Sequence, residues 1–129
     1  MITVKNPVLD VFEKWLSNMQ SIKGITCSMQ KSAIPNKYPY STIYMMGAPG
    51  NKWDLDGNES AIIPAFQVDS YAKGQKALSK AYEIDNISHQ AMTEMGFRRT
   101  YGPEQIEGSD KTVVRVVSRY NRLYCGESF

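Results

Sequence analysis

Apolar residues recur about every 3.6 positions in two stretches of the chain, the spacing of a helix with one buried face. The first stretch opens at Asn6-Pro7, since asparagine can cap a helix and proline is tolerated in its first turn, and it closes near Gly24. Its apolar positions share one face: Val8, Val11, Phe12, Trp15, Leu16 and Met19. The second stretch runs from about Gly74 to Met95, with Gly96 placed as its C-terminal cap. Its apolar stripe is made of Ala77, Leu78, Ala81, Ile84, Ile87, Ala91, Met92 and Met95.

Alternation with a period of two, and enrichment in β-branched and aromatic residues, predict strands elsewhere. The predicted strands cover residues 25–29, 41–46, 61–72, 97–101 and 112–124. Pro64 cannot donate to a strand ladder, so it predicts an edge or a bulge in the third of these strands. Proline, glycine and asparagine mark a loop at residues 32–39, a long connection at residues 47–60 and a turn at residues 108–111.

The same alternation assigns side chains to faces. In the third predicted strand, Ile62, Phe66 and Val68 share one face and Gln67, Asp69 and Tyr71 the other. In the last strand, Val114, Val116 and Tyr120 oppose Lys111, Arg115, Arg119 and Asn121, with Val113 and Val117 among the latter. The order of elements is helix, three strands, helix, two strands. It favours an α+β fold with an antiparallel or mixed sheet of about five strands and two helices packed on one face.

Length and composition agree with a single domain spanning residues 1–129. The chain weighs 14.6 kDa, and its 42% hydrophobic and 22% charged residues are ordinary values for a globular protein. No apolar run approaches the roughly 20 residues of a membrane span. The first ten residues lack the pattern of a secretory signal, so we expect synthesis inside the cell. The net charge of +2 is low for a protein that binds by neutralising phosphates.

Candidate chemistry is sparse, and we expect no enzyme activity, no cofactor and no metal site. His89 is the lone histidine and lies four positions after Asp85, a pair that is common on helix surfaces and that could also orient an imidazole for catalysis. Cys27 and Cys125 have no metal or redox spacing and are expected to be reduced and buried. The stretch DLDGNE at residues 54–59 departs from the calcium-loop pattern at both the first and the bidentate ligand position.

Two surfaces are candidates for binding a partner. The late strands carry basic and aromatic residues that suit either a protein contact or a nucleic-acid surface. They are Arg98, Arg99, Tyr101, Lys111, Arg115, Arg119, Tyr120, Arg122 and Tyr124. The long connection carries Trp53, Asp54, Leu55 and Asp56, and a tryptophan there either anchors a partner or folds back over the sheet.

The sequence FQVDSYAKGQKALSKAYEIDNISHQAMTEMGFRRT, residues 66–100, joins a strand to an amphipathic helix that ends at Gly-Phe-Arg-Arg and returns to a strand. The closing VVRVVSRYNRLY, residues 113–124, follows it. This pattern resembles the tail-terminator, or tail completion, proteins of long-tailed bacteriophages and prophages. The resemblance covers residues 61–124 and, by order of elements, the first helix. Residues 25–60 carry no matching motif.

The resemblance implies a structural virion protein, made in the host cytoplasm and located in the tail. Such proteins form a six-membered ring on the head-proximal end of the tail tube, stop its polymerisation and dock the head connector. The implied partners are further copies of the chain, the tail tube protein and the head connector protein, while DNA passes through the ring without specific binding. We expect subunit contacts at Trp53, Asp54, Leu55, Asp56, Arg98, Arg99, Arg115, Arg119 and Arg122. A small nucleic-acid-binding module using the basic, tyrosine-bearing sheet is the alternative.

Overall fold

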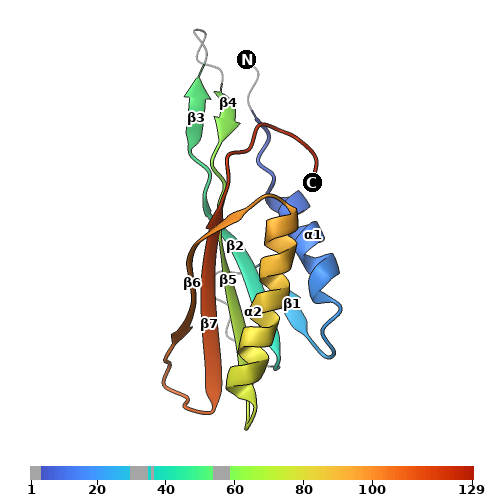
Figure 1. Cartoon of the computed structure of the whole chain (residues 1–129), viewed down its shortest axis with the longest axis vertical. Coiled ribbons are helices and arrows are strands. Elements are labelled where there is room, and N and C mark those ends of the chain that lie inside the picture. The colour runs from blue at the N-terminus through green and yellow to red at the C-terminus, as the bar shows by residue number, and fades with distance from the viewer. Residues whose placement is uncertain (1–3, 30–34, 36, 54–58) are drawn as a thin grey trace.

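A computed structural model describes residues 4–29, 35, 37–53 and 59–129 of the chain. Its elements follow the order α1 (Val8–Met19), β1 (Thr26–Ser28), β2 (Tyr40–Gly47), β3 (Gly50–Trp53), β4 (Glu59–Ile62), β5 (Ala65–Lys73), α2 (Ala77–Glu94), β6 (Arg98–Ile106) and β7 (Val113–Asn121). Five strands form one sheet in the order β1-β2-β5-β7-β6, in which only the β1–β2 pairing is parallel. The predicted α+β class, with a mixed five-stranded sheet, is confirmed (Figure 1).

Local contacts mark the start of α1 and the end of α2. Before α1, the Asn6 side-chain oxygen accepts a hydrogen bond from the backbone N–H of Val8 at 3.0 Å, although Pro7 is the residue at the N-cap position. After α2, Gly96 adopts a φ of +84°, and the N–H of Phe97 donates to the Met92 carbonyl at 3.0 Å. This is the glycine-terminated helix end that the sequence predicts. Neither helix is both long and apolar enough to cross a bilayer, within the residues that the structure describes.

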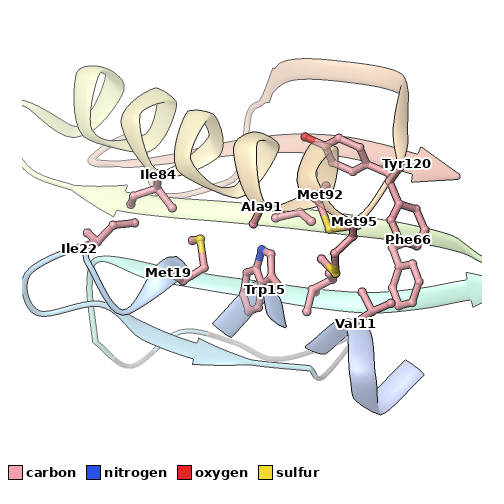
Figure 2. Packing of buried hydrophobic residues seen from close by; sticks show 13 residues of the cluster. Val11, Trp15, Met19, Ile22, Phe66, Ile84, Ala91, Met92, Met95 and Tyr120 are labelled. Atoms are coloured by element: carbon pink, nitrogen blue, oxygen red, sulfur yellow. The ribbon is translucent and has the colours of Figure 1, made fainter. Parts of the chain in front are cut away.

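The hydrophobic core fills the space between the two helices and one face of the sheet (Figure 2). Trp15 from α1, Met92 from α2 and Phe66 from β5 are fully or almost fully buried there, together with Tyr120 from β7. The indole N–H of Trp15 donates to the Ser88 hydroxyl at 2.8 Å, which ties the two helices together inside the core. The core therefore fixes both helices on the same side of the sheet.

Polar residues of α2 depart from the predicted pattern. Asp85 and Ser88 are buried on the sheet-facing side of the helix, whereas Leu78 of the predicted apolar stripe is 51% exposed. The expectation that Asp85 belongs to a helix-surface pair is therefore wrong. The reason is that both buried polar side chains find partners on distant elements, Asp85 on β6 and β7 and Ser88 on α1.

The long connection at residues 47–60 contains structure that its composition does not predict. β3 and β4 pair as an antiparallel hairpin that extends beyond one end of the five-stranded sheet, and we call this hairpin the arm (Figure 1). Backbone hydrogen bonds of 2.9 Å join Ile62 to Tyr124 in both directions, and the Ile63 N–H donates to the Pro49 carbonyl at 2.9 Å. The base of the arm is thus held by the C-terminal segment and by its own first residues.

The single strand predicted over residues 61–72 is two strands. β4 ends at Ile62 and β5 begins at Ala65, so Ile63 and Pro64 form the break between the arm and the main sheet. β5 lies at the centre of that sheet, between β2 and β7. Pro64 therefore marks neither an edge strand nor a bulge within the strand. It stands where the missing N–H removes no ladder hydrogen bond.

Gly102 lies where β6 shifts register against β7, and it offers a test of this pairing. Its φ is +85°, and a Cβ at this position would overlap the carbonyl oxygen of Val117. We expect Gly102→Ala to lower the free energy of unfolding by about 2 kcal/mol or more, because strain and overlap add. Gly108→Ala is the matched control, since a Cβ there meets nothing within 4 Å. Urea unfolding of both variants measures the difference, and equal stabilities would contradict this account of β6.

Candidate interface on the open face of the sheet

The sheet face opposite the helices carries a band of arginine, tyrosine, aspartate and glutamine. The register places Gln67 of β5 beside Arg119 of β7, and Tyr71 beside Arg115. Tyr44 of β2 lies on the other side of Gln67, and Tyr101 of β6 on the other side of Arg119. Within the described parts of the chain, no helix or further strand packs on this face (Figure 1). We call these side chains and Asp69 the open face.

Hydrogen bonds join the polar side chains of the open face into a chain. Arg115 donates to Asp69 at 2.9 Å, and the Gln67 amide donates to the other oxygen of the same carboxylate at 2.8 Å. Arg119 in turn donates through Nε to the Gln67 carbonyl oxygen at 2.9 Å. Asp69 and Gln67 are buried beneath the arginines, so their orientation is fixed by these partners. The arginine side chains are therefore held in place before any partner arrives.

Aromatic rings support both arginines. The Arg119 guanidinium lies 4.8 Å from the centre of the Tyr101 ring, and that of Arg115 lies 5.9 Å from the centre of the Tyr71 ring. Burial and then the Asp69 carboxylate raise the pKa of the Tyr71 hydroxyl to about 12. Tyr71 therefore stays neutral at physiological pH, and the counterion of Arg115 is Asp69. The arrangement can bind a partner through surface contacts, with positive charge and ring area combined.

A groove of about 410 Å³ lies at the end of the open face nearest the arm. It is lined by Tyr44, Met45, Met46, Gln67 and Arg119. Met46 is 45% exposed, which is high for a large apolar side chain. The alternation of the last strand predicts the position of Arg119, but the contribution of β2 to the groove follows only from the sheet order.

Arg99 lies on the opposite side of the sheet from Arg115 and Arg119. It donates to Asp85 of α2 at 2.9 Å and to the Tyr120 hydroxyl at 3.1 Å. A second donor, the Ser118 hydroxyl, reaches the other oxygen of Asp85 at 2.7 Å. The register shift between Arg99 and Tyr101 explains this placement, because it turns the two residues to different faces. Arg99 belongs to the packing between α2 and the sheet.

His89 joins the hydrogen bonds that connect Arg99, Asp85, Ser118 and Tyr120, and we call these five side chains the inner network. Its Nδ1 lies 3.2 Å from the Tyr120 hydroxyl. Burial and the nearby Arg99 guanidinium lower the pKa of the imidazole below its usual value, against an opposing effect of Asp85. The imidazole and the Tyr120 hydroxyl lie within hydrogen-bond distance, and Tyr120 also accepts from Arg99. Asp85 and His89 therefore each bond a different group, Asp85 to Arg99 and Ser118 and His89 to Tyr120.

The remaining predicted interface residues lie apart from one another. Arg98 is exposed at the start of β6. Arg122 follows β7, donates to the Met95 carbonyl and to Glu127, and lies over the rings of Tyr124 and Phe129. The one continuous basic, tyrosine-bearing surface suggested by the sequence is thus divided, and its Tyr120 is fully buried. The backbone of Trp53 belongs to β3, while Asp54, Leu55 and Asp56 lie outside the described residues.

Both cysteines are free thiols, but only Cys27 is partly buried, so the expected buried pair is wrong for the exposed Cys125. Burial raises the pKa of Cys27 to about 11. Since the thiolate is the reactive form, about one Cys27 in a thousand is reactive at pH 8. We expect a thiol reagent to label Cys125 at least about a hundredfold faster than Cys27 in the folded protein. Mass mapping of partial labelling, with Cys125→Ser as control, measures this ratio. Equal labelling would contradict it.

The described residues contain no group of three or more histidine, cysteine, aspartate or glutamate side chains placed to hold a metal ion.

The fold and the open face together define an α+β protein with one covered and one uncovered sheet face. Comparison with models of known protein families and with curated protein sequences gives no match.

Among solved structures, the chain is similar to the gp17 protein of bacteriophage SPP1, with a TM-score of 0.42 and 12% sequence identity. The match covers 92% of this chain and 93% of that one.

Proposed function

We propose that the chain is a structural virion protein that caps the head-proximal end of a phage tail tube as a ring. In this role it ends tube polymerisation, docks the head connector and catalyses no reaction. The observation that carries the proposal is the open face, where arginines are oriented by buried partners yet no described helix or strand covers them. The motif pattern of residues 66–100 and 113–124 supports the same reading through its resemblance to tail terminators.

A closed ring imposes a requirement that this architecture can meet. Subunits that join head to tail contribute two different surfaces to each contact. The open face offers one such surface, and the arm, which extends beyond the sheet, offers a second place of contact (Figure 1). In sequence the arm segment also carries Asp54, Asp56 and Glu59, whose charge is opposite to that of Arg115 and Arg119. On this proposal the protein is made in the host cytoplasm and ends in the virion tail.

Tube growth tests the proposed function directly. Purified protein is added to polymerising tail tube protein, and tube lengths are measured by negative-stain imaging, with particle mass measured by light scattering. We expect tubes that stop growing and carry a ring at one end. Arg115→Ala with Arg119→Ala should abolish capping, whereas Lys80→Ala with Lys111→Ala, which removes two solvent-exposed ion pairs, should not. Unaltered tube growth in the presence of the wild-type protein would overturn the proposal.

One observation favours the alternative of nucleic-acid binding. Arginine and tyrosine share one sheet face, and such faces can stack exposed bases. Against it, Asp69 pairs with Arg115. Binding of a single-stranded oligonucleotide, measured at several salt concentrations, separates the two functions. Affinity that falls steeply with salt and is lost in the double arginine variant would favour the module. The capping proposal expects no such affinity.

A further inference from the structure

We propose that helix α1 of one copy docks in the Met46–Arg119 groove of the next copy, in a head-to-tail contact. The Met46–Arg119 groove is the 410 Å³ groove at the arm end of the open face. The inference rests on the proposed ring and adds α1 to the arm as a surface that would contact the open face of the next copy. Both surfaces lie entirely within the described residues.

The groove has a mostly polar lining in which the exposed Met46 lies beside a positive charge. Met46 is exposed, and the flexible thioether chain of methionine adapts to the shape of an incoming side chain. Arg119 is exposed and forms no ion pair with any described residue, since its contacts are the Gln67 amide and the Tyr101 ring. A fitting partner therefore presents an apolar side chain next to a carboxylate.

The outer face of α1 has this composition. Leu9 is 59% exposed, the highest exposure among the large apolar residues that the structure describes. Glu13 follows it one helical turn later on the same face, and Asp10 lies next to Glu13 on the side away from the leucine. Neither carboxylate forms an ion pair with a described residue. Leu9 matches the exposed Met46, and Glu13, with Asp10 next to it, matches Arg119.

The positions of the two surfaces decide the type of contact. α1 lies on the helix side of the sheet, and the groove lies on the open side (Figure 1). A copy that uses its groove for one neighbour keeps its α1 free for another. Such a contact joins different surfaces and repeats from copy to copy, which produces a ring when the rotation closes. Opposite charges across the contact also disfavour pairing of like faces.

Cross-linking tests the contact even if association is weak. In a Cys125→Ser background, the pair Leu9→Cys with Met46→Cys should form disulfide-linked ladders beyond the dimer under mild oxidation. Each single variant should stop at the dimer, because it offers one new thiol per copy. The matched control pair is Leu78→Cys with Met46→Cys, since Leu78 is similarly exposed on α2. A ladder of equal yield from the control pair, or no ladder from the Leu9 pair, would overturn the inference.

Exchanging the charges of Arg119 and Glu13 is an independent test of the contact. Arg119→Glu and Glu13→Arg should each weaken self-association, measured by sedimentation, by roughly tenfold or more. The two changes together in one chain, and an equimolar mixture of the two single variants, should restore it. Arg119→Glu with Glu94→Arg is the control and should remain weak.

The outcomes separate this inference from the ring itself. If the wild-type protein assembles or caps tubes but neither the Leu9 ladder nor the charge rescue appears, the α1 docking is wrong and the ring stands. If the wild-type protein neither assembles nor caps tubes, the proposed function and the docking fall together.

Discussion

Replacing Asp85 by alanine is expected to lower the free energy of unfolding by about 3 kcal/mol, because it breaks a buried ion pair from one side. The carboxylate is 2% exposed and accepts from Arg99 at 2.9 Å and from Ser118 at 2.7 Å. Without it, the Arg99 guanidinium stays between α2 and β6 with no counterion, and the Ser118 hydroxyl loses its acceptor. Partial exposure of Arg99 keeps the expected cost at the lower end of the range for such pairs.

The double variant Asp85→Ala with Arg99→Ala distinguishes a charge effect from a loss of packing. Once both partners are gone no uncompensated charge remains, so the double variant should cost clearly less than the sum of the two single variants. Glu83→Ala is the control on the same helix, since its pair with Lys80 is solvent-exposed and should contribute less than about 0.5 kcal/mol. Denaturant unfolding gives all four values. A cost below about 1 kcal/mol for Asp85→Ala would contradict the inner network.

Replacing Trp15 by alanine is expected to cost about 4 kcal/mol, which is typical of a fully buried aromatic side chain. Trp15 is the largest side chain in the core, and its indole N–H bonds Ser88 of α2 at 2.8 Å (Figure 2). Removing it opens a cavity between the two helices and leaves the Ser88 hydroxyl without its donor. We therefore expect α1 to loosen before the sheet does, which hydrogen exchange of the α1 amides would detect.

Two variants serve as controls for Trp15. Leu9→Ala on the same helix removes an exposed side chain and should change stability by less than about 0.5 kcal/mol. Trp15→Phe keeps most of the ring volume but not the donor, so its cost should lie between those of Leu9→Ala and Trp15→Ala. A Trp15→Ala protein as stable as Leu9→Ala would show that α1 is not held by this side chain.

The periodicity of the chain is sufficient to predict both helices, the class of the fold and the two faces of β5 and β7. These features depend on neighbours a few positions apart, which a single sequence contains. The arm was missed because glycine, proline and asparagine dominate residues 47–60, and pairing between β3 and β4 overrides that local preference. The sequence does not predict the break at Pro64, because the strands on both sides of it are apolar and resemble a single continuous strand.

The candidate interface was predictable only in part. Alternation along β7 places Arg115 and Arg119 together, but the partners that orient them, Asp69 and Gln67, lie 46 and 52 positions away. Only the sheet order brings them side by side. Arg99 faces the helices and not the open face because a register shift in β6 reverses the alternation, and Gly102-Pro103, just after that shift, is its one local signal. The interface roles of all nine candidate residues remain predictions: Trp53, Asp54, Leu55, Asp56, Arg98, Arg99, Arg115, Arg119 and Arg122.

The arm leaves and rejoins the main sheet at neighbouring points. Gly47 at the end of β2 lies directly opposite Ala65 at the start of β5, and these two strands are adjacent. A short turn from Gly47 to Ala65 would therefore close the chain without altering the strand pairing of the main sheet. In evolution, insertions and deletions in the arm that keep Ile62 paired with Tyr124 can accumulate at little cost to folding, so related chains can differ here while sharing the same core.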